Sequence, residues 1–186
     1  MTDPRGSGDA APLPLDLLKE NLAAANKVAH RLLWSRNRVE ALMPLDTAKV
    51  DALGDEDEER LDAFLLRFNS LTAMVQDHVT RAILLSEEED LKGRSKKDQR
   101  LLMEKLGALK PELNFGTLAE LRNRIAHHYP DDSAKQAEIL NEVFVRSNDL
   151  LDGYNTALTY ADQKLFGSKL DLHPVRTDSG ANLKHS

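Results

Sequence analysis

The stretch LDAFLLRFNSLTAMVQDHVTRAI, from Leu61 to Ile83, decides the fold class. Apolar residues recur in it every three or four positions, which keeps them on one side of an α-helix for about six turns. An acidic run from Asp55 to Glu59 precedes it, and negative charge is favourable at the N-terminal end of a helix dipole. We therefore predict a long amphipathic helix whose core stripe is Leu61, Phe64, Leu65, Phe68, Leu71, Val75, Val79 and Ile83.

Two further long helices show the same periodicity. The first begins near Leu15 and stops before Pro44, because proline cannot continue a helix. Its apolar face carries Leu15, Leu18, Leu22, Ala25, Ala29, Leu32, Leu33 and Val39. The last begins near Ser133, with Gln136 completing a capping box. It buries Ile139, Val143, Phe144, Leu150, Leu151, Tyr154, Leu158 and Leu165.

Short helices are indicated between these long ones by further capping boxes, in which a hydroxyl residue is followed three positions later by an acidic one. Ser95 with Asp98 predicts a helix that ends near Gly107, and Thr117 with Glu120 predicts one that ends before Pro130. Ser86 with Glu89 predicts a short helical restart before Gly93.

We thus expect an all-α fold, an antiparallel helical bundle of three long and two short helices spanning residues 15–166. The segments 1–14 and 167–186 lack apolar periodicity and are predicted to be flexible tails.

Composition excludes several classes of protein. Of the 186 residues 41% are hydrophobic, which excludes wholesale disorder, and the absence of cysteine excludes disulfide scaffolds, iron–sulfur clusters and thiol nucleophiles. The N-terminus has no signal-peptide pattern and no apolar run reaches the length of a membrane span, so we expect a cytoplasmic protein. A net charge of −6 argues against nucleic-acid binding through the whole surface but allows a local basic site.

The residues that suit chemistry crowd into the short helix TLAELRNRIAHHY. At about 100° per residue, Leu118, Leu121, Ile125 and His128 share the core stripe, whereas Asn123 and His127 point away from it. Arg122 and Tyr129 lie at the edge of the stripe. His128 is accordingly interpreted as a core or interface histidine.

An exposed histidine beside arginines suits cleavage of RNA. Imidazole exchanges protons near neutral pH, and a guanidinium stabilises the crowded charge of a phosphoryl transition state. The ribose 2′-hydroxyl supplies the nucleophile, so no metal or other cofactor is expected. Geometry alone favours the plainer interpretation that these are surface residues or helix-end caps.

The segment RNRIAH, Arg122 to His127, resembles the RNxxxH signature of HEPN-domain proteins, helical bundles that often act as ribonucleases. Read as R-x4-H-x-Y through Tyr129, it is similar to the HepT toxins, whose antitoxin is a minimal nucleotidyltransferase of the MntA type. Two further segments look HepT-like, so that the resemblance covers roughly Glu58 to Leu165: RF-x-x-L-x(4)-Q-D, from Arg67 to Asp77, and DQRLLMEKLGAL, which follows it.

The resemblance implies a homodimer in which two motif helices line a shared cleft around RNA. Arg122 and His127 would be the catalytic pair, Asn123 would orient the histidine or the phosphate, and the antitoxin would attach AMP to Tyr129. Added phosphate there would repel RNA and block the cleft. A non-catalytic alternative stays open, in which the same fold is the partner or substrate-binding subunit of a nucleotidyltransferase. A third alternative is a purely structural helical dimer.

Lys92, Arg94, Lys96, Lys97 and Arg100 form the one dense basic track. It is either a solvated loop or a guide for RNA, and in the second case Lys96, Lys97, Arg100 and the motif residue Arg124 would contact RNA. Trp34, Tyr154 and Tyr160 are interpreted as core or interface residues, and His30, with Arg31, Arg36 and Arg38 near it, as part of a solvated helix face.

Overall fold

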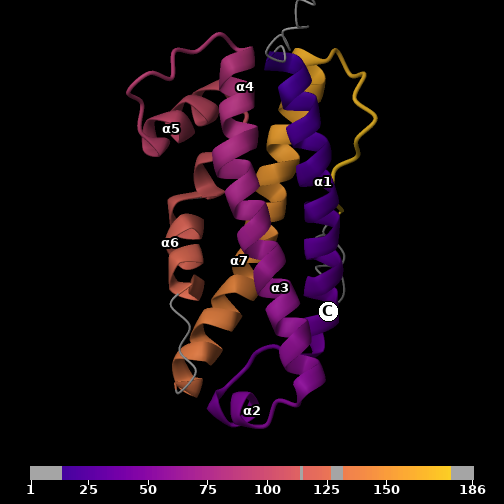
Figure 1. The fold of residues 1–186 in the computed structure, drawn as a ribbon, viewed down its shortest axis with the longest axis vertical. Coiled ribbons are helices and arrows are strands. Elements are labelled where there is room, and N and C mark those ends of the chain that lie inside the picture. Colours follow the sequence, from indigo (N-terminus) through magenta and orange to yellow (C-terminus); the bar gives the residue numbers. More distant parts are fainter. Residues whose placement is uncertain (1–13, 114, 127–131, 177–186) are drawn as a thin grey trace, which may run out of the picture.

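A computed structural model describes residues 14–113, 115–126 and 132–176, and these contain helices but no strand. The three long helices are present, which confirms the all-α prediction (Figure 1). They are α1 (Pro14–Val39), the continuous rod formed by α3 (Asp55–Ala73), a π turn (Met74–Val79) and α4 (Thr80–Ser86), and α7 (Ser133–Tyr160).

Shorter elements connect the rods. The two short helices are α5 (Lys96–Leu106) and α6 (Phe115–Ala126). An additional one, α2 (Thr47–Asp51), was not predicted; its N-cap is Asp46, whose carboxylate accepts from the Lys49 amide. The 3₁₀ turns are Glu40–Leu42 and Pro111–Leu113, and a π turn, Ala161–Leu165, extends α7.

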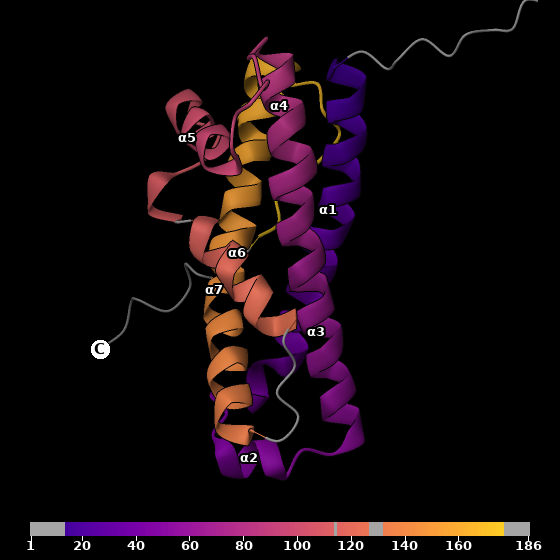
Figure 2. The same ribbon diagram turned by 60° about the vertical axis from the view of Figure 1, so that its left-hand side comes forward.

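The long helices do not all alternate in direction (Figure 1). The Ser133 hydroxyl at the start of α7 donates to Asp51, just before α3 begins, while the Tyr160 hydroxyl donates to Glu87 at the end of α4. Hence α7 runs parallel to the α3–α4 rod, and α1 is antiparallel to both (Figures 1 and 2). The predicted antiparallel order holds for α1 against both other rods, and α7 is parallel to the α3–α4 rod because the chain first returns along the bundle through α5 and α6.

The core lies where α1, α3 and α7 meet, and it is fully apolar apart from a few hydroxyls. Tyr154 of α7 is completely buried, and its hydroxyl donates to the carbonyl oxygen of Leu22 in α1 at 3.3 Å. Burial raises the pKa of this phenol to about 12, so it remains a neutral donor. Leu15, predicted on the apolar face, is instead exposed at the start of α1.

The π turn corrects a drift in the apolar pattern. Leu71, Val75, Val79 and Ile83 are all fully buried although they are spaced four, four and four residues apart. In a regular helix each such step overshoots a full turn by about 40°, so the stripe would rotate away from the core. The wider π turn takes up the surplus and keeps all four side chains inside.

Three predicted helix caps can be compared with the structure. The Ser95–Asp98 capping box is confirmed: the Ser95 hydroxyl donates to Asp98 at 2.7 Å, which lowers the pKa of that carboxyl. The restart at Ser86 is wrong, because this hydroxyl donates to the Ala82 carbonyl oxygen within α4. The cap of α7 is Asp132, whose side chain accepts from the Lys135 amide, and not Ser133 with Gln136.

Asparagines of α7 tie extended segments to the bundle. Asn141 accepts from the Leu45 amide and donates to the Leu45 carbonyl oxygen, both at 2.8 Å. Asn155 makes the same pair of bonds, both at 2.8 Å, with Val175, which is only 2% exposed. The packed part of the chain therefore continues to Val175, beyond the predicted boundary at residue 166.

Replacing Asn155 by alanine should release the segment 167–176, because both bonds to Val175 are lost at a net cost of about 1 kcal/mol each. We expect the Val175 amide to lose its protection in hydrogen exchange while the core helices keep theirs. Asn148→Ala is the matched control, since no hydrogen bond joins this asparagine to the described C-terminal segment. Unchanged protection of Val175 in the Asn155 variant would contradict this role.

Candidate functional site

Helix α6 carries the described part of the signature, and its faces match the sequence prediction. Leu118 and Leu121 are each 1% exposed and face the core, whereas Asn123 is exposed and Arg122 is half-buried. Gly116, Ala119 and Asn123 follow one another at intervals of three and four residues, so they share the outward stripe. His127, His128 and Tyr129 lie outside the described residues.

The start of α6 is fixed by close packing on α7. A Cβ atom added to Gly153 would lie 2.9 Å from Cε2 of Phe115 and 3.3 Å from Cδ1 of Leu113, so only glycine leaves room for the ring. The Gln76 amide in the π turn donates to the Phe115 carbonyl oxygen at 3.3 Å. Burial of Phe115 explains why the helix begins two residues before the predicted Thr117–Glu120 capping box.

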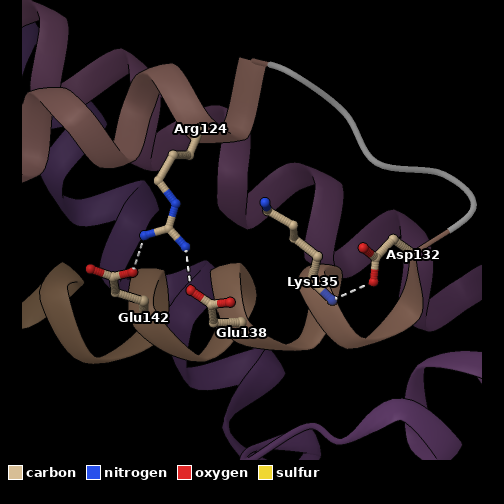
Figure 3. A network of polar contacts seen from close by, with 5 residues as sticks. All are labelled: Arg124, Asp132, Lys135, Glu138 and Glu142. Atoms are coloured by element: carbon tan, nitrogen blue, oxygen red, sulfur yellow. Dashed lines mark hydrogen bonds and ion pairs between the residues drawn. The ribbon is translucent and has the colours of Figure 1, made fainter.

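The C-terminal part of α6 is held by an ion-pair fork (Figure 3). Arg124 lies 2.7 Å from Glu138 and 2.5 Å from Glu142, one turn apart on α7. The hydrogen bond that Arg124 donates to Glu142 raises the pKa of the guanidinium above its usual value. An RNA contact by Arg124 stays a prediction, and the structure shows its guanidinium bound to two carboxylates of its own chain.

Sequence reasoning missed Glu138 and Glu142 as partners. Their spacing of four residues was the available signal, because it places two carboxylates side by side on one helix face. Choosing Arg124 as the partner required the register between α6 and α7, which the sequence does not display.

The predicted basic residues lie beside the first turn of α6. Lys96, Lys97 and Arg100 of α5 line a cavity of about 210 Å³ together with Gln76, Thr80, Leu109, Phe115, Gly116 and Ala119. The outward stripe of α6 thus begins at the basic cavity and leads to Asn123. The structure therefore brings together three of the four predicted RNA contacts and the exposed face of the motif helix.

The three cations are not equally engaged. Lys96 pairs with Asp77 of the π turn, and Nε of Arg100 lies 3.5 Å from Glu104. Lys97 is exposed and pairs with no carboxylate among the residues the structure describes. The π turn thus contacts both short helices, α5 through Asp77 and α6 through Gln76.

Comparison with protein-family models, with curated proteins and with solved structures gave no match. Within the described ranges, no helix combines the length and the apolar character that a membrane span requires. In the same ranges no group of three or more acidic or histidine side chains is arranged to hold a metal ion.

Gly153→Ala should destabilise the protein although alanine is the better helix former by about 1 kcal/mol. The added methyl group would force the Phe115 ring aside, and overpacking of this kind costs about 1–3 kcal/mol. We expect a lower melting temperature and a displaced α6. Combining the change with Phe115→Leu should give a loss smaller than the sum of the two single losses, and strict additivity would refute the contact.

Proposed function

We propose that this protein is a metal-independent endoribonuclease of the HEPN type that acts as a toxin on cellular RNA, such as transfer RNA or messenger RNA. The observation that carries the proposal is the arrangement on α6 of the described part of the RNxxxH signature, Arg122 to Ala126. Asn123 is exposed opposite buried Leu118 and Leu121, and Arg122 lies at the edge of the same outward face. No ion pair with the described residues engages Arg122, so its guanidinium remains available to a phosphate.

The proposed reaction needs only a proton carrier and a cation. His127 takes the proton from the ribose 2′-hydroxyl, the 2′ oxygen attacks phosphorus, and the bond to the 5′ oxygen breaks. The leaving 5′ oxygen takes up the proton that His127 carries, which restores the neutral histidine. The products are a cyclic phosphate and a 5′-hydroxyl. Arg122 stabilises the negative charge that gathers on phosphorus, and Asn123 orients the histidine or the phosphate.

A homodimer would complete the proposed site, because Asn123 on the outward stripe of α6 is exposed in the described part of the chain and two copies would supply two Arg122–His127 pairs. The partner that restrains the enzyme would be an MntA-type nucleotidyltransferase, which attaches AMP to Tyr129. The added phosphate would bring negative charge and bulk into the proposed cleft and so repel RNA. Lys96, Lys97 and Arg100 would guide the RNA backbone toward this face.

RNA cleavage in the presence of EDTA by purified protein is the deciding experiment. We expect the wild type to cleave, leaving a cyclic phosphate, and Arg122→Ala and His127→Ala each to lower the rate at least a hundredfold, as loss of a transition-state charge partner does. Arg81→Ala, an exposed arginine on α4, is the matched control and should retain full activity. Melting and sizing must show that the inactive variants still fold and dimerise.

Absence of cleavage by wild-type protein whose mass shows no AMP adduct would overturn the enzyme and favour the non-catalytic nucleotidyltransferase subunit. Loss of the dimer in His127→Ala would make this residue an interface residue and not a catalytic one.

Lys97→Ala should raise KM for RNA several-fold with kcat unchanged, because a cation that only binds the backbone contributes equally to substrate and transition state. Lys96→Ala should have the smaller effect, since Asp77 already pairs with this lysine. Steady-state kinetics at two salt concentrations measure both. A fall in kcat at constant KM in the Lys97 variant would disprove a guiding role.

A further inference from the structure

Helix α1 contains an unusual separation of charge for a chain with net charge −6. From Asn21 to Val39 there is no aspartate or glutamate, while five basic or titratable residues occur there: Lys27, His30, Arg31, Arg36 and Arg38. A solvated helix face normally carries both acidic and basic side chains. A surface of one sign instead concentrates a potential that attracts ligands of the opposite charge.

Helical geometry gathers most of these charges around the single tryptophan. Lys27, Arg31, Trp34 and Arg38 are spaced by four, three and four residues, so they form one stripe along α1, and all four are exposed. Trp34, which the sequence suggested to be a core or interface residue, is 53% exposed. Burial therefore does not account for it.

A cation from the neighbouring helix completes the arrangement. Cζ of Arg38 lies 4.7 Å from the centroid of the Trp34 ring, and Cζ of Arg67 in α3 lies 5.2 Å from it. Neither guanidinium has an ion-pair partner within the ranges that the structure describes. We call Lys27, Arg31, Trp34, Arg38 and Arg67 the Trp34 face.

The Trp34 face borders a hollow with unused hydrogen-bonding capacity. A cavity of about 300 Å³ is lined by Trp34, Arg38 and Arg67 together with Ser35, Glu56, Glu59, Arg60 and Ala63. Ser35 is only 2% exposed, and its hydroxyl has no hydrogen-bond partner among the described residues. The buried atoms Nε of Arg60 and Nη1 of Arg67 also lack one. Buried polar atoms are normally paired, so the residues around this cavity have hydrogen-bonding capacity that the described part of the chain leaves unused.

We propose that the Trp34 face binds single-stranded RNA, with a phosphate between Arg38 and Arg67 and a base on the indole. Two like charges held against one ring repel each other, and an anion placed between them removes that repulsion. An exposed indole offers a base a stacking surface, which an acidic peptide would leave unused. Cations along a strand with an aromatic ring among them are the usual design of sites for single-stranded nucleic acid.

The charges around the cavity also indicate the path of the bound strand along the protein surface. Glu56 and Glu59 lie at the end of the cavity formed by the first turns of α3, where Glu56 pairs with Arg60. Phosphates are repelled from this end, so the strand runs from Arg38 toward Arg31, about two helical turns away, and Lys27, about one turn further.

The Trp34 face is separate from the motif helix. In both ribbon views α1 and α6 lie on opposite sides of the α3–α4 rod, so the two surfaces belong to different faces of one protomer (Figures 1 and 2). RNA binding here is carried by observations independent of the cleavage motif, and it stands even if the protein cleaves nothing.

The test is binding of a fluorescein-labelled, single-stranded 2′-O-methyl RNA oligonucleotide, whose blocked 2′ oxygen cannot take part in cleavage. Because Trp34 is the only tryptophan, its intrinsic fluorescence reports stacking at this position, and an unlabelled oligonucleotide of the same sequence should quench it. Trp34→Ala should weaken binding about tenfold, and Trp34→Phe should restore part of the affinity.

Arg38→Ala and Arg67→Ala should each weaken binding and each reduce the salt dependence by about 0.7 in the slope of log K against log salt concentration. Glu59→Gln should strengthen binding by removing a negative charge from the cavity. Arg81→Ala on α4 serves as the matched control and should bind like the wild type.

Binding that leaves Trp34 fluorescence unchanged, or that survives the Trp34 and Arg67 substitutions, would overturn the proposal. Equal affinity for a polyglutamate peptide at the same salt concentration would overturn it in favour of an acidic protein partner. Since the probe cannot be cleaved, a failure of binding here is distinct from a failure of the ribonuclease proposal, which the EDTA cleavage experiment tests separately.

Discussion

The contact between the Phe115 ring and the bare backbone of Gly153 sets where α6 lies, and the candidate site depends on that position. The first turn of α6 is held there and by Gln76, and its later turns are held by the Arg124 fork to α7. With both parts fixed, rotation of α6 about its own axis is blocked. Leu118 and Leu121 then stay in the core and Asn123 stays outside, as the proposed shared site of two copies requires.

The long helices could be predicted from the sequence because their stability comes from a continuous apolar stripe. The spacing of apolar residues along the sequence reveals such a stripe directly. Helix starts were predicted less well, since a hydroxyl–acid pair indicates a cap only where no stronger packing intervenes. At Ser95 no buried side chain just before the cap draws the chain into the helix earlier, and the capping box forms. At Thr117 the burial of Phe115 two residues earlier draws the chain into the helix sooner, so the same pattern has no capping role.

In the candidate site, too, features local to one helix could be predicted, whereas contacts between helices could not. The outward orientation of Asn123 followed from rotation per residue, a property local to one helix. The placement of Lys96, Lys97 and Arg100 beside the first turn of α6, and the engagement of Arg124 with Glu138 and Glu142, depend on how separate helices are aligned. Trp34 illustrates the limit most clearly, because helical position alone does not distinguish a buried tryptophan from an exposed one between two arginines.

The acid-free part of α1 makes the molecule an electric dipole as well as an anion. A polyanion approaching from afar meets the net negative charge and is repelled, whereas within the Debye length of about 8 Å at physiological salt it meets the local charge of one face. Moderate salt therefore screens the long-range repulsion before it weakens the short contacts. Productive encounters depend on how the protein is turned at the moment of approach, so rotational diffusion enters the association rate together with translation.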